Sequence, residues 1–489
     1  MSQFLLHLHR ICKSGPVFRI QEMEEQFESF FDQETIALVK RFEGMLLLEN
    51  HFFFDVDEFE DLIEYYFFRN ELNQAQTCIR FSLEQHPGCN NLLLKQVQYL
   101  INVNKDAEAL QLLAEITPRV IQDFDLHFAL GNLYSQLEKP EKAIAEYKLA
   151  IGGEEDADEL YSNIAFEYEN LGKYDKAIDY LLKTLELNPD HEAALYELSF
   201  CCEVSQQTER SISFLKGFLD AHPYSKAAWF NLGIAYSNQE HFKLAIDAYD
   251  FVIAIDETFA SAYFNKANCY ANIGDYQLAL EVYFETFYHE EPEPVTYYYI
   301  AECYEKLKQF DSAVTYYKKA VGLDPEFADA WLGIGISYDE LGKSRNALPY
   351  INKAIKLTPT VPEYWFILGD IQIKLSKIEE GISSYRKVIE LDPENSDVWL
   401  DLSVVYADMK NFDKACLTLT EGLHWHGEHA DFHYGIAYYL FNSGKIKQAN
   451  EVLSKALEMD FEGHKRLFIT FPDARNRPEV LEIIEGFKK

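Results

Sequence analysis

A strict 34-residue period organises most of this chain and constrains its fold more than any other feature. The segment that starts at Lys226 aligns without a gap on the segment that starts at Ala328. Steps of 34 residues in both directions place twelve repeats between residues 56 and 463, with no insertion or deletion. Such a period is typical of helical solenoids, in which each repeat packs only against its neighbours.

Fixed positions within the repeat hold residues of one chemical kind. Position 11 is tyrosine in eight repeats, position 4 holds four of the five tryptophans, and position 32 is proline in six. Position 20 is small in all twelve repeats, which place there Ala75, Ala109, Ala143, Ala177, Ser211, Ala245, Ala279, Ala313, Ala347, Gly381, Ala415 and Ala449.

The spacing of these positions predicts two helices in each repeat. Positions 4, 7, 8 and 11 share one helical face, and positions 20, 24 and 27 share a face of a second helix. Small residues at positions 8 and 20 let the two helices approach closely. Glycine at position 15 in four repeats predicts a turn between them, and proline at position 32 ends the second helix. The fold class is therefore all-α.

One repeat shows a family pattern directly. Trp229, Leu232, Gly233, Tyr236, Ala245 and Tyr249 match W-x-x-L-G-x-x-Y…A-x-x-x-F. The chain thereby resembles the tetratricopeptide repeat family, over residues 56–463. The resemblance implies a right-handed α-solenoid superhelix of about twelve helix-turn-helix units, whose first helices line a concave groove. Repeats 2 and 5 depart from the pattern, with Gln96 at position 7 and Cys202 at position 11.

The two ends of the chain lie outside the repeats. Residues 1–21 contain no Asp or Glu, and we expect a disordered or loosely docked segment there. We expect residues 22–55 to form N-terminal capping helices and residues 464–489 to form a C-terminal capping helix that starts near Pro478. Such caps cover the apolar faces of the first and last repeats.

The resemblance also implies where a ligand would lie. Family ligands contact positions 2, 5, 6, 9 and 12 of the first helices, and these positions are rich in aromatic and amide side chains here. Rings supply contact area and amides bond a peptide backbone. The alternative is that the rings only pack against neighbouring helices. The candidate groove residues are Phe128, Asn163, Phe166, Tyr196, Phe230, Asn231, Phe264, Asn265, Asn268, Tyr298, Phe366 and Tyr434.

The acidic composition bears on the choice of partner. The formal net charge is -37, which disfavours nucleic acid and anionic membrane surfaces. Acidity either serves solubility or attracts a basic partner. Chaperone-binding members of the family use a basic clamp for a terminal carboxylate. Where that clamp would need basic residues, this chain has Phe264, Asp329 and Gly333.

No motif indicates catalysis, and we expect neither an enzyme nor a cofactor. Gly342-Lys343-Ser344 mimics the end of a phosphate-binding loop, but its glycine is the turn glycine of position 15. The cluster of His424, His426, His429 and His433 is compatible with a metal site or with an inter-repeat loop. Cysteines recur at position 10, which favours packing in a reducing compartment.

The sequence thus predicts a cytoplasmic scaffold that binds partner proteins or peptides in a concave groove. The alternative is a structural protein that acts through acidic outer faces or by self-association. At the proline-rich loop His289–Pro294 we expect either a weak joint or a stiff extended link.

Overall fold

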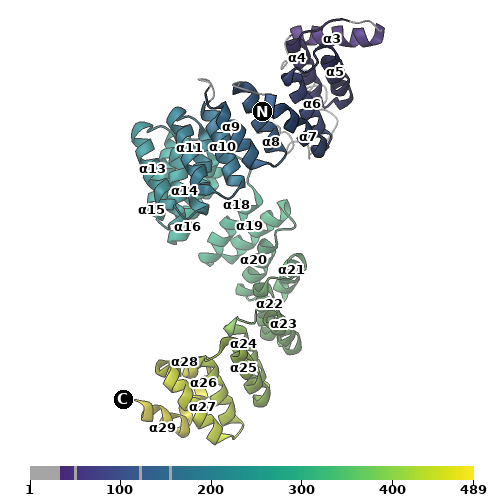
Figure 1. Cartoon of the computed structure of the whole chain (residues 1–489). Helices are drawn as coiled ribbons and strands as arrows, with labels where there is room; N and C mark the ends of the chain where they lie inside the picture. Colours follow the sequence, from purple (N-terminus) through teal and green to yellow (C-terminus); the bar gives the residue numbers. More distant parts are fainter. Residues whose placement is uncertain (1–32, 49–51, 120–123, 153–156, 489) are drawn as a thin grey trace. The chain divides into compact units, whose positions relative to one another are not determined.

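The computed structural model describes residues 33–48, 52–119, 124–152 and 157–488. All regular structure in these residues is helical (Figure 1), and consecutive helices pack in pairs. The predicted all-α fold class is therefore confirmed. Eleven of the twelve first helices begin at the residue that the 34-residue step predicts, and α10 begins one residue earlier.

Each repeat contributes one odd-numbered and one even-numbered helix. The first helices are α4 (Val56–Phe68), α6 (Asn90–Asn102), α8 (Phe124–Gln136), α10 (Ala157–Asn170), α12 (Glu192–Val204), α14 (Lys226–Asn238), α16 (Ala260–Ile273), α18 (Pro294–Lys306), α20 (Ala328–Glu340), α22 (Pro362–Lys374), α24 (Ser396–Asp408) and α26 (Ala430–Asn442). The second helices are α5 (Leu72–Gln85), α7 (Asp106–Ile116), α9 (Pro140–Ala150), α11 (Tyr174–Leu187), α13 (Thr208–Ala221), α15 (Phe242–Ile255), α17 (Tyr276–Thr286), α19 (Phe310–Leu323), α21 (Ser344–Leu357), α23 (Ile378–Leu391), α25 (Phe412–His426) and α27 (Ile446–Met459).

The small residues of position 20 lie in the core, as predicted. The ten alanines there are fully buried, Ser211 is 2% exposed and Gly381 is buried. Position 8 has the same role on the first helix. A Cβ atom added to Gly131 would lie 2.4 Å from the ring of Tyr147, and one added to Gly335 would lie 2.4 Å from Ile351. The two helices of a repeat can therefore approach only because these side chains are absent or minimal.

The turn between the two helices has one backbone conformation in every repeat. Position 15 has a positive φ, between 55° and 91°, in all twelve. Glycine occupies it in four repeats, as the sequence indicates, and the other eight use Asn70, Asn104, Glu138, Gln206, Glu240, Lys308, Ser376 and Lys410. Gly342 has this turn conformation, so the residues that mimic a phosphate-binding loop lie in a helix–helix turn.

The tryptophans of position 4 join successive repeats. Each of the four indole N–H groups donates to the carbonyl oxygen of the position-32 proline in the preceding repeat, at 2.8 to 3.0 Å. The pairs are Trp229 with Pro223, Trp331 with Pro325, Trp365 with Pro359 and Trp399 with Pro393. Tryptophan and proline thus belong to one contact between repeats.

Helices outside the repeats pack on both ends of the array. Helix α3 (Gln33–Leu48) places Phe42, which is fully buried, against the rings of Phe54 and Phe59. At the other end, α29 (Pro478–Phe487) begins at Pro478, as expected. Helix α28 (His464–Thr470) precedes it. The described residues also contain three 3₁₀ turns, at Thr117–Arg119, Phe461–Gly463 and Pro472–Asn476. The expectations for residues 1–32 lie outside the described residues.

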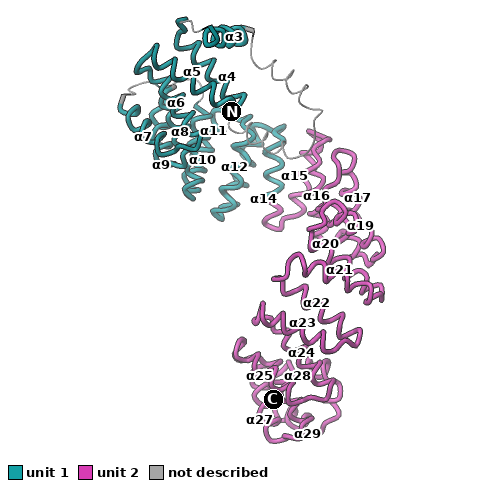
Figure 2. The backbone as a smooth tube through the Cα atoms, turned by 90° about the vertical axis from the view of Figure 1, so that its right-hand side faces the viewer, with its two compact units in different colours: residues 1–235 teal, residues 236–489 magenta. Residues whose placement is uncertain are grey.

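The chain divides into two compact units, residues 1–235 and 236–489, coloured separately in Figure 2. We call them the N-terminal and C-terminal units. The division falls within α14 and not at the loop His289–Pro294, where the sequence suggested a joint. In that loop, the imidazole of His289 stacks on Tyr263 with ring centroids 5.0 Å apart.

Candidate partner-binding groove

A recurring group of three side chains positions the candidate groove residues. In four repeats, the ring at position 5 contacts a tyrosine at position 24 of the second helix, with centroids 5.6 to 6.0 Å apart. These pairs are Phe128 with Tyr147, Phe264 with Tyr283, Tyr298 with Tyr317 and Phe366 with Tyr385. The position-5 rings are half-buried, so they pack on the neighbouring helix and also keep an accessible part.

The hydroxyl groups of these tyrosines reach polar residues on the first helices. Tyr147 donates to Asn132 at 2.8 Å, and Tyr283 donates to Asn268. Tyr317 donates to Glu305 at 3.1 Å, and Tyr385 donates to Asp370 at 2.5 Å. Each hydrogen bond fixes the orientation of a polar side chain at position 9 or 12.

In the N-terminal unit, successive first helices form a groove of about 750 Å³. Its lining comes from α4, α6, α8 and α10, with Tyr147 from α9. It brings together three of the predicted residues, Phe128, Asn163 and Phe166. We call this hollow the α4–α10 groove.

Amide side chains dominate the polar lining of the α4–α10 groove. They are Asn91, Gln98, Asn132, Gln136 and Asn163. Gln98 donates to Gln136 across two helices at 3.0 Å. Since each amide both donates and accepts, such a lining can pair with the N–H and C=O groups of an extended peptide backbone.

Charged residues of the groove lie on α4, α6 and α10. The carboxylate of Glu64 accepts from the ammonium of Lys95. Glu60 also lines the groove, and its Oε1 atom is buried with no hydrogen-bond partner. Most of these residues are absent from the sequence-based candidates, which were chosen mainly for aromatic rings at position 5. Glu60, Glu64, Asn91 and Gln98 occupy positions 5, 9, 2 and 9 of repeats 1 and 2, which was the available signal.

The aromatic surface continues from the groove onto α12. Phe166 is 53% exposed, Phe200 is 50% exposed and Tyr196 is 36% exposed. Glu169 follows Phe166 by three residues on α10, and Glu197 precedes Phe200 by three residues on α12. Burial, and next the charge of Glu197, raise the pKa of the Glu169 carboxyl to about 8.

Three predicted groove residues are corrected by the structure, because they are buried. Phe230 is 8% exposed and packs against Tyr196. Asn231 is 2% exposed, and its amide donates to the carbonyl of Ala227 one turn earlier. Tyr434 is 2% exposed, and its hydroxyl donates to the carbonyl of Asp460. At most 8% of the surface of each residue remains for a ligand, although Tyr434 borders a small hollow of about 210 Å³.

The remaining candidates lie on first helices of the C-terminal unit. Asn265 and Asn268 of α16 are half-buried, as are Phe264, Tyr298 and Phe366. The hydroxyl of Tyr298 donates to Glu302 at 3.0 Å. Carboxyls accompany these amides on the first helices of the C-terminal unit, at Glu302, Glu305 and Asp370.

Burial shifts several carboxyls on these first helices. It raises the pKa of Glu302, Glu305 and Asp370, although each accepts a hydrogen bond from a tyrosine. Burial, and next the charge of Asp370, raise the pKa of Asp401 to about 6. These carboxyls are therefore less stable as anions than carboxyls in open water.

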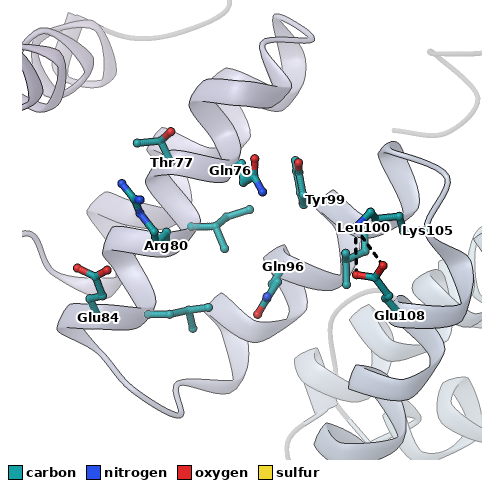
Figure 3. Close-up of a pocket in the computed structure, with 11 residues that line it drawn as sticks. Gln76, Thr77, Arg80, Glu84, Gln96, Tyr99, Leu100, Lys105 and Glu108 are labelled. Carbon is teal, nitrogen blue, oxygen red and sulfur yellow. Dashed lines mark hydrogen bonds and ion pairs between the residues drawn. The ribbon is translucent and has the colours of Figure 1, made fainter.

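A second hollow of about 660 Å³ involves the second helices (Figure 3). Gln76, Arg80 and Glu84 project from α5, Gln96 and Tyr99 from α6, and Lys105 and Glu108 from the start of α7. Lys105 and Glu108 form an ion pair at 3.0 Å. No predicted groove residue lies in this hollow, and its charges of both signs lie close together.

The other sequence signals have structural explanations. His433 is buried and its Nδ1 lies 2.9 Å from the carbonyl oxygen of His429. Among the described residues, no group of three or more histidine, cysteine or acidic side chains is arranged to hold a metal ion. Cys201, Cys269 and Cys303 are buried, and burial raises the pKa of each thiol. Over the same residues, no helix combines the length and apolarity needed to cross a bilayer.

Comparison with known proteins identifies the repeats. Family profiles described as tetratricopeptide repeat match residues 124–152, 159–191, 230–285, 294–327, 328–361, 362–395 and 384–416. No curated protein matches the chain.

Several solved structures are similar to parts of the chain. The C-terminal part of a TPR repeat-containing protein from Cytophaga hutchinsonii is 20% identical, with a TM-score of 0.43, and the match covers 50% of this chain and 99% of that one. A tetratricopeptide repeat protein from Parabacteroides merdae is 14% identical, with a TM-score of 0.40 and coverage of 51% and 98%. YrrB, described as a TPR protein with an unusual peptide-binding site, is 18% identical, with a TM-score of 0.33 and coverage of 38% and 95%.

Proposed function

Because the chain belongs to the tetratricopeptide repeat family, whose repeats generally serve as protein-interaction scaffolds, we propose that it binds an extended segment of a partner protein in the α4–α10 groove. The observation that carries this proposal is the groove's lining of five amides between partly exposed rings. Such a surface provides backbone hydrogen bonds and apolar contact area together, as peptide recognition requires. The scaffold works by binding and not by catalysis.

Preorganisation supports the proposal. The hydroxyl of Tyr147 holds the side chain of Asn132 in one orientation through a hydrogen bond, and the Gln98–Gln136 hydrogen bond links α6 to α8. A ligand that meets oriented side chains loses less conformational entropy on binding. The formal net charge of -37 further favours a partner that carries basic residues.

Site-specific photo-crosslinking in the native cell tests the location of binding. A photoreactive residue at Asn163 reports on the groove, and one at Gln74, an exposed residue of α5, reports on the outer face. We expect the partner to be captured from position 163 and not from position 74. Capture from position 74 alone would contradict the proposal.

The purified partner then allows a quantitative test. Replacing Gln98 and Asn163 by alanine removes two groove amides and should raise Kd about tenfold, equivalent to about 1.4 kcal/mol. The matched control replaces Asn73 and Gln74, which are exposed on α5, by alanine and should leave Kd unchanged. Equal affinity of the groove variant and the wild type would reject the α4–α10 groove as the binding site.

A further inference from the structure

A face of α10 and α12 adjoins the α4–α10 groove and has a different chemistry. It consists of Phe166 and Glu169 on α10, and of Tyr196, Glu197 and Phe200 on α12, and we call it the α10–α12 face. Phe166 and Glu169 are three residues apart on one helix, and Glu197 and Phe200 are three residues apart on the other, so each helix presents a ring next to a carboxyl. Phe166 also lines the groove, so the two surfaces are continuous.

About half of the surface of each phenylalanine on this face is exposed to solvent. Phe166 is 53% exposed and Phe200 is 50% exposed. Among the ring contacts of the described residues, Phe200 makes a single one. Its partner is Tyr174, in a T-shaped arrangement with the centroids 6.5 Å apart. Exposed rings that cluster on one face indicate a surface that a partner covers.

The carboxyls between these rings lack a cation. None of the ion pairs in the described part of the chain includes Glu169 or Glu197. The Oε1 atom of Glu169 is buried and has no hydrogen-bond partner. The groups that act on Glu169 are Glu197 and the thiol of Cys201, so no positive charge offsets the pair. A cation placed beside the two carboxyls would stabilise both of them as anions.

We infer that the α10–α12 face binds a lysine or arginine side chain of the partner segment that occupies the groove. The aliphatic stem of such a side chain packs on Phe166 and Phe200, and its charged end reaches Glu169 and Glu197. Charge complementarity selects this occupant, because the face offers three rings and two carboxyls, and the neighbouring cation Lys226 acts on Tyr196 but not on Glu169. No group of three ligands in the described residues can hold a metal ion there. The inference rests on the proposed function and adds the chemistry of the partner.

Fluorescence anisotropy with a defined probe tests the inference. The probe is a short labelled peptide of alternating lysine and alanine, and its control is the same peptide with every lysine acetylated. The full-length wild type should bind the lysine peptide at least about tenfold more tightly than the acetylated peptide. The double variant Glu169→Gln/Glu197→Gln should lose most of this difference.

A matched variant separates local recognition from general charge attraction. Glu141→Gln/Glu186→Gln also removes two negative charges, but from exposed positions on the second helices α9 and α11. It should bind the lysine peptide as the wild type does. Equal weakening in both double variants, or none in either, would overturn the inference. Circular dichroism checks that all variants remain folded.

Kd measurements with the partner captured at position 163 distinguish a failure of the inference from a failure of the proposed function. If its Kd rises in the Gln98/Asn163 alanine variant but not in Glu169→Gln/Glu197→Gln, the groove binds the partner and the inference is wrong. If neither variant changes its Kd, the proposed function fails as well.

Discussion

At the scale of single residues, the fold depends on side chains that are small enough to let helices meet. All twelve position-20 residues are buried, and the sequence predicts this because a period of 34 returns each of them to one face. Exposure of the groove candidates was less predictable. Tyr434 has the same register position as Phe366, but its hydroxyl bonds Asp460 at the end of the last repeat. Register alone does not reveal what covers a position.

Overpacking position 20 should destabilise a repeat. Ala143 is fully buried in α9, whereas Ala145 of the same helix is exposed. Ala143→Leu should lower the free energy of unfolding by about 1–3 kcal/mol, because the added atoms have no space. Ala145→Leu should change it by less than about 0.5 kcal/mol. Urea unfolding followed by circular dichroism measures both, and equal effects would contradict the buried register.

The Glu169 carboxyl should make stability depend on pH. Its pKa is raised from 4.5 to about 8 in the folded chain, so the folded state binds more protons than the unfolded state between these values. Stability contributed by this carboxyl therefore falls as pH rises through that window. Glu169→Gln, which mimics the protonated form, should raise Tm relative to the wild type near pH 8.5 and leave it unchanged near pH 5. The same comparison with Glu186→Gln, at an exposed position, should show no such trend.

At the scale of elements, the period predicts the beginnings of the helices to within one residue. It predicts the turn less completely. Position 15 has a positive φ in every repeat, yet only four repeats have glycine there. The other eight repeats have Asn, Glu, Gln, Lys or Ser at this position. The conformation is imposed by the two packed helices and not by the residue, so residue identity alone could not reveal it.

Relief of backbone strain at this turn should stabilise a repeat. Ser376 has φ 63°, in the left-handed region that costs an L-residue about 1–2 kcal/mol. Ser376→Gly should raise the free energy of unfolding by about 0.5–1 kcal/mol, after the greater freedom of glycine in the unfolded chain is subtracted. The reverse change at the equivalent position of the preceding repeat, Gly342→Ser, should lower it by a similar amount. Denaturant midpoints that move in the opposite directions would refute the argument.

The indole contact between repeats should also be measurable. Trp331→Phe keeps an aromatic ring but removes the 3.0 Å hydrogen bond to the carbonyl of Pro325. We expect a loss of about 1–2 kcal/mol, from the hydrogen bond and the smaller ring. Trp425→Phe is the control, because Trp425 is 58% exposed, and thermal unfolding should scarcely change. A loss as large in the control would show that the hydrogen bond does not matter.

At the scale of the whole molecule, the two units differ in the chemistry of their first helices. The N-terminal unit lines a groove with amides and rings, and the C-terminal unit adds partly buried carboxyls to the amides Asn265 and Asn268 on its first helices. The family resemblance leads to the expectation that positions 2, 5, 6, 9 and 12 of the first helices face a ligand. It did not predict which repeats form a hollow, because that depends on how neighbouring side chains fill the space.

Hydrogen–deuterium exchange on the full chain, with and without the partner captured at position 163, shows which helices the bound segment covers. We expect slower exchange in α4, α6, α8, α10 and α12 when the partner is bound, with no change in the second helices α5, α7, α9 and α11. Protection confined to those second helices would contradict this expectation.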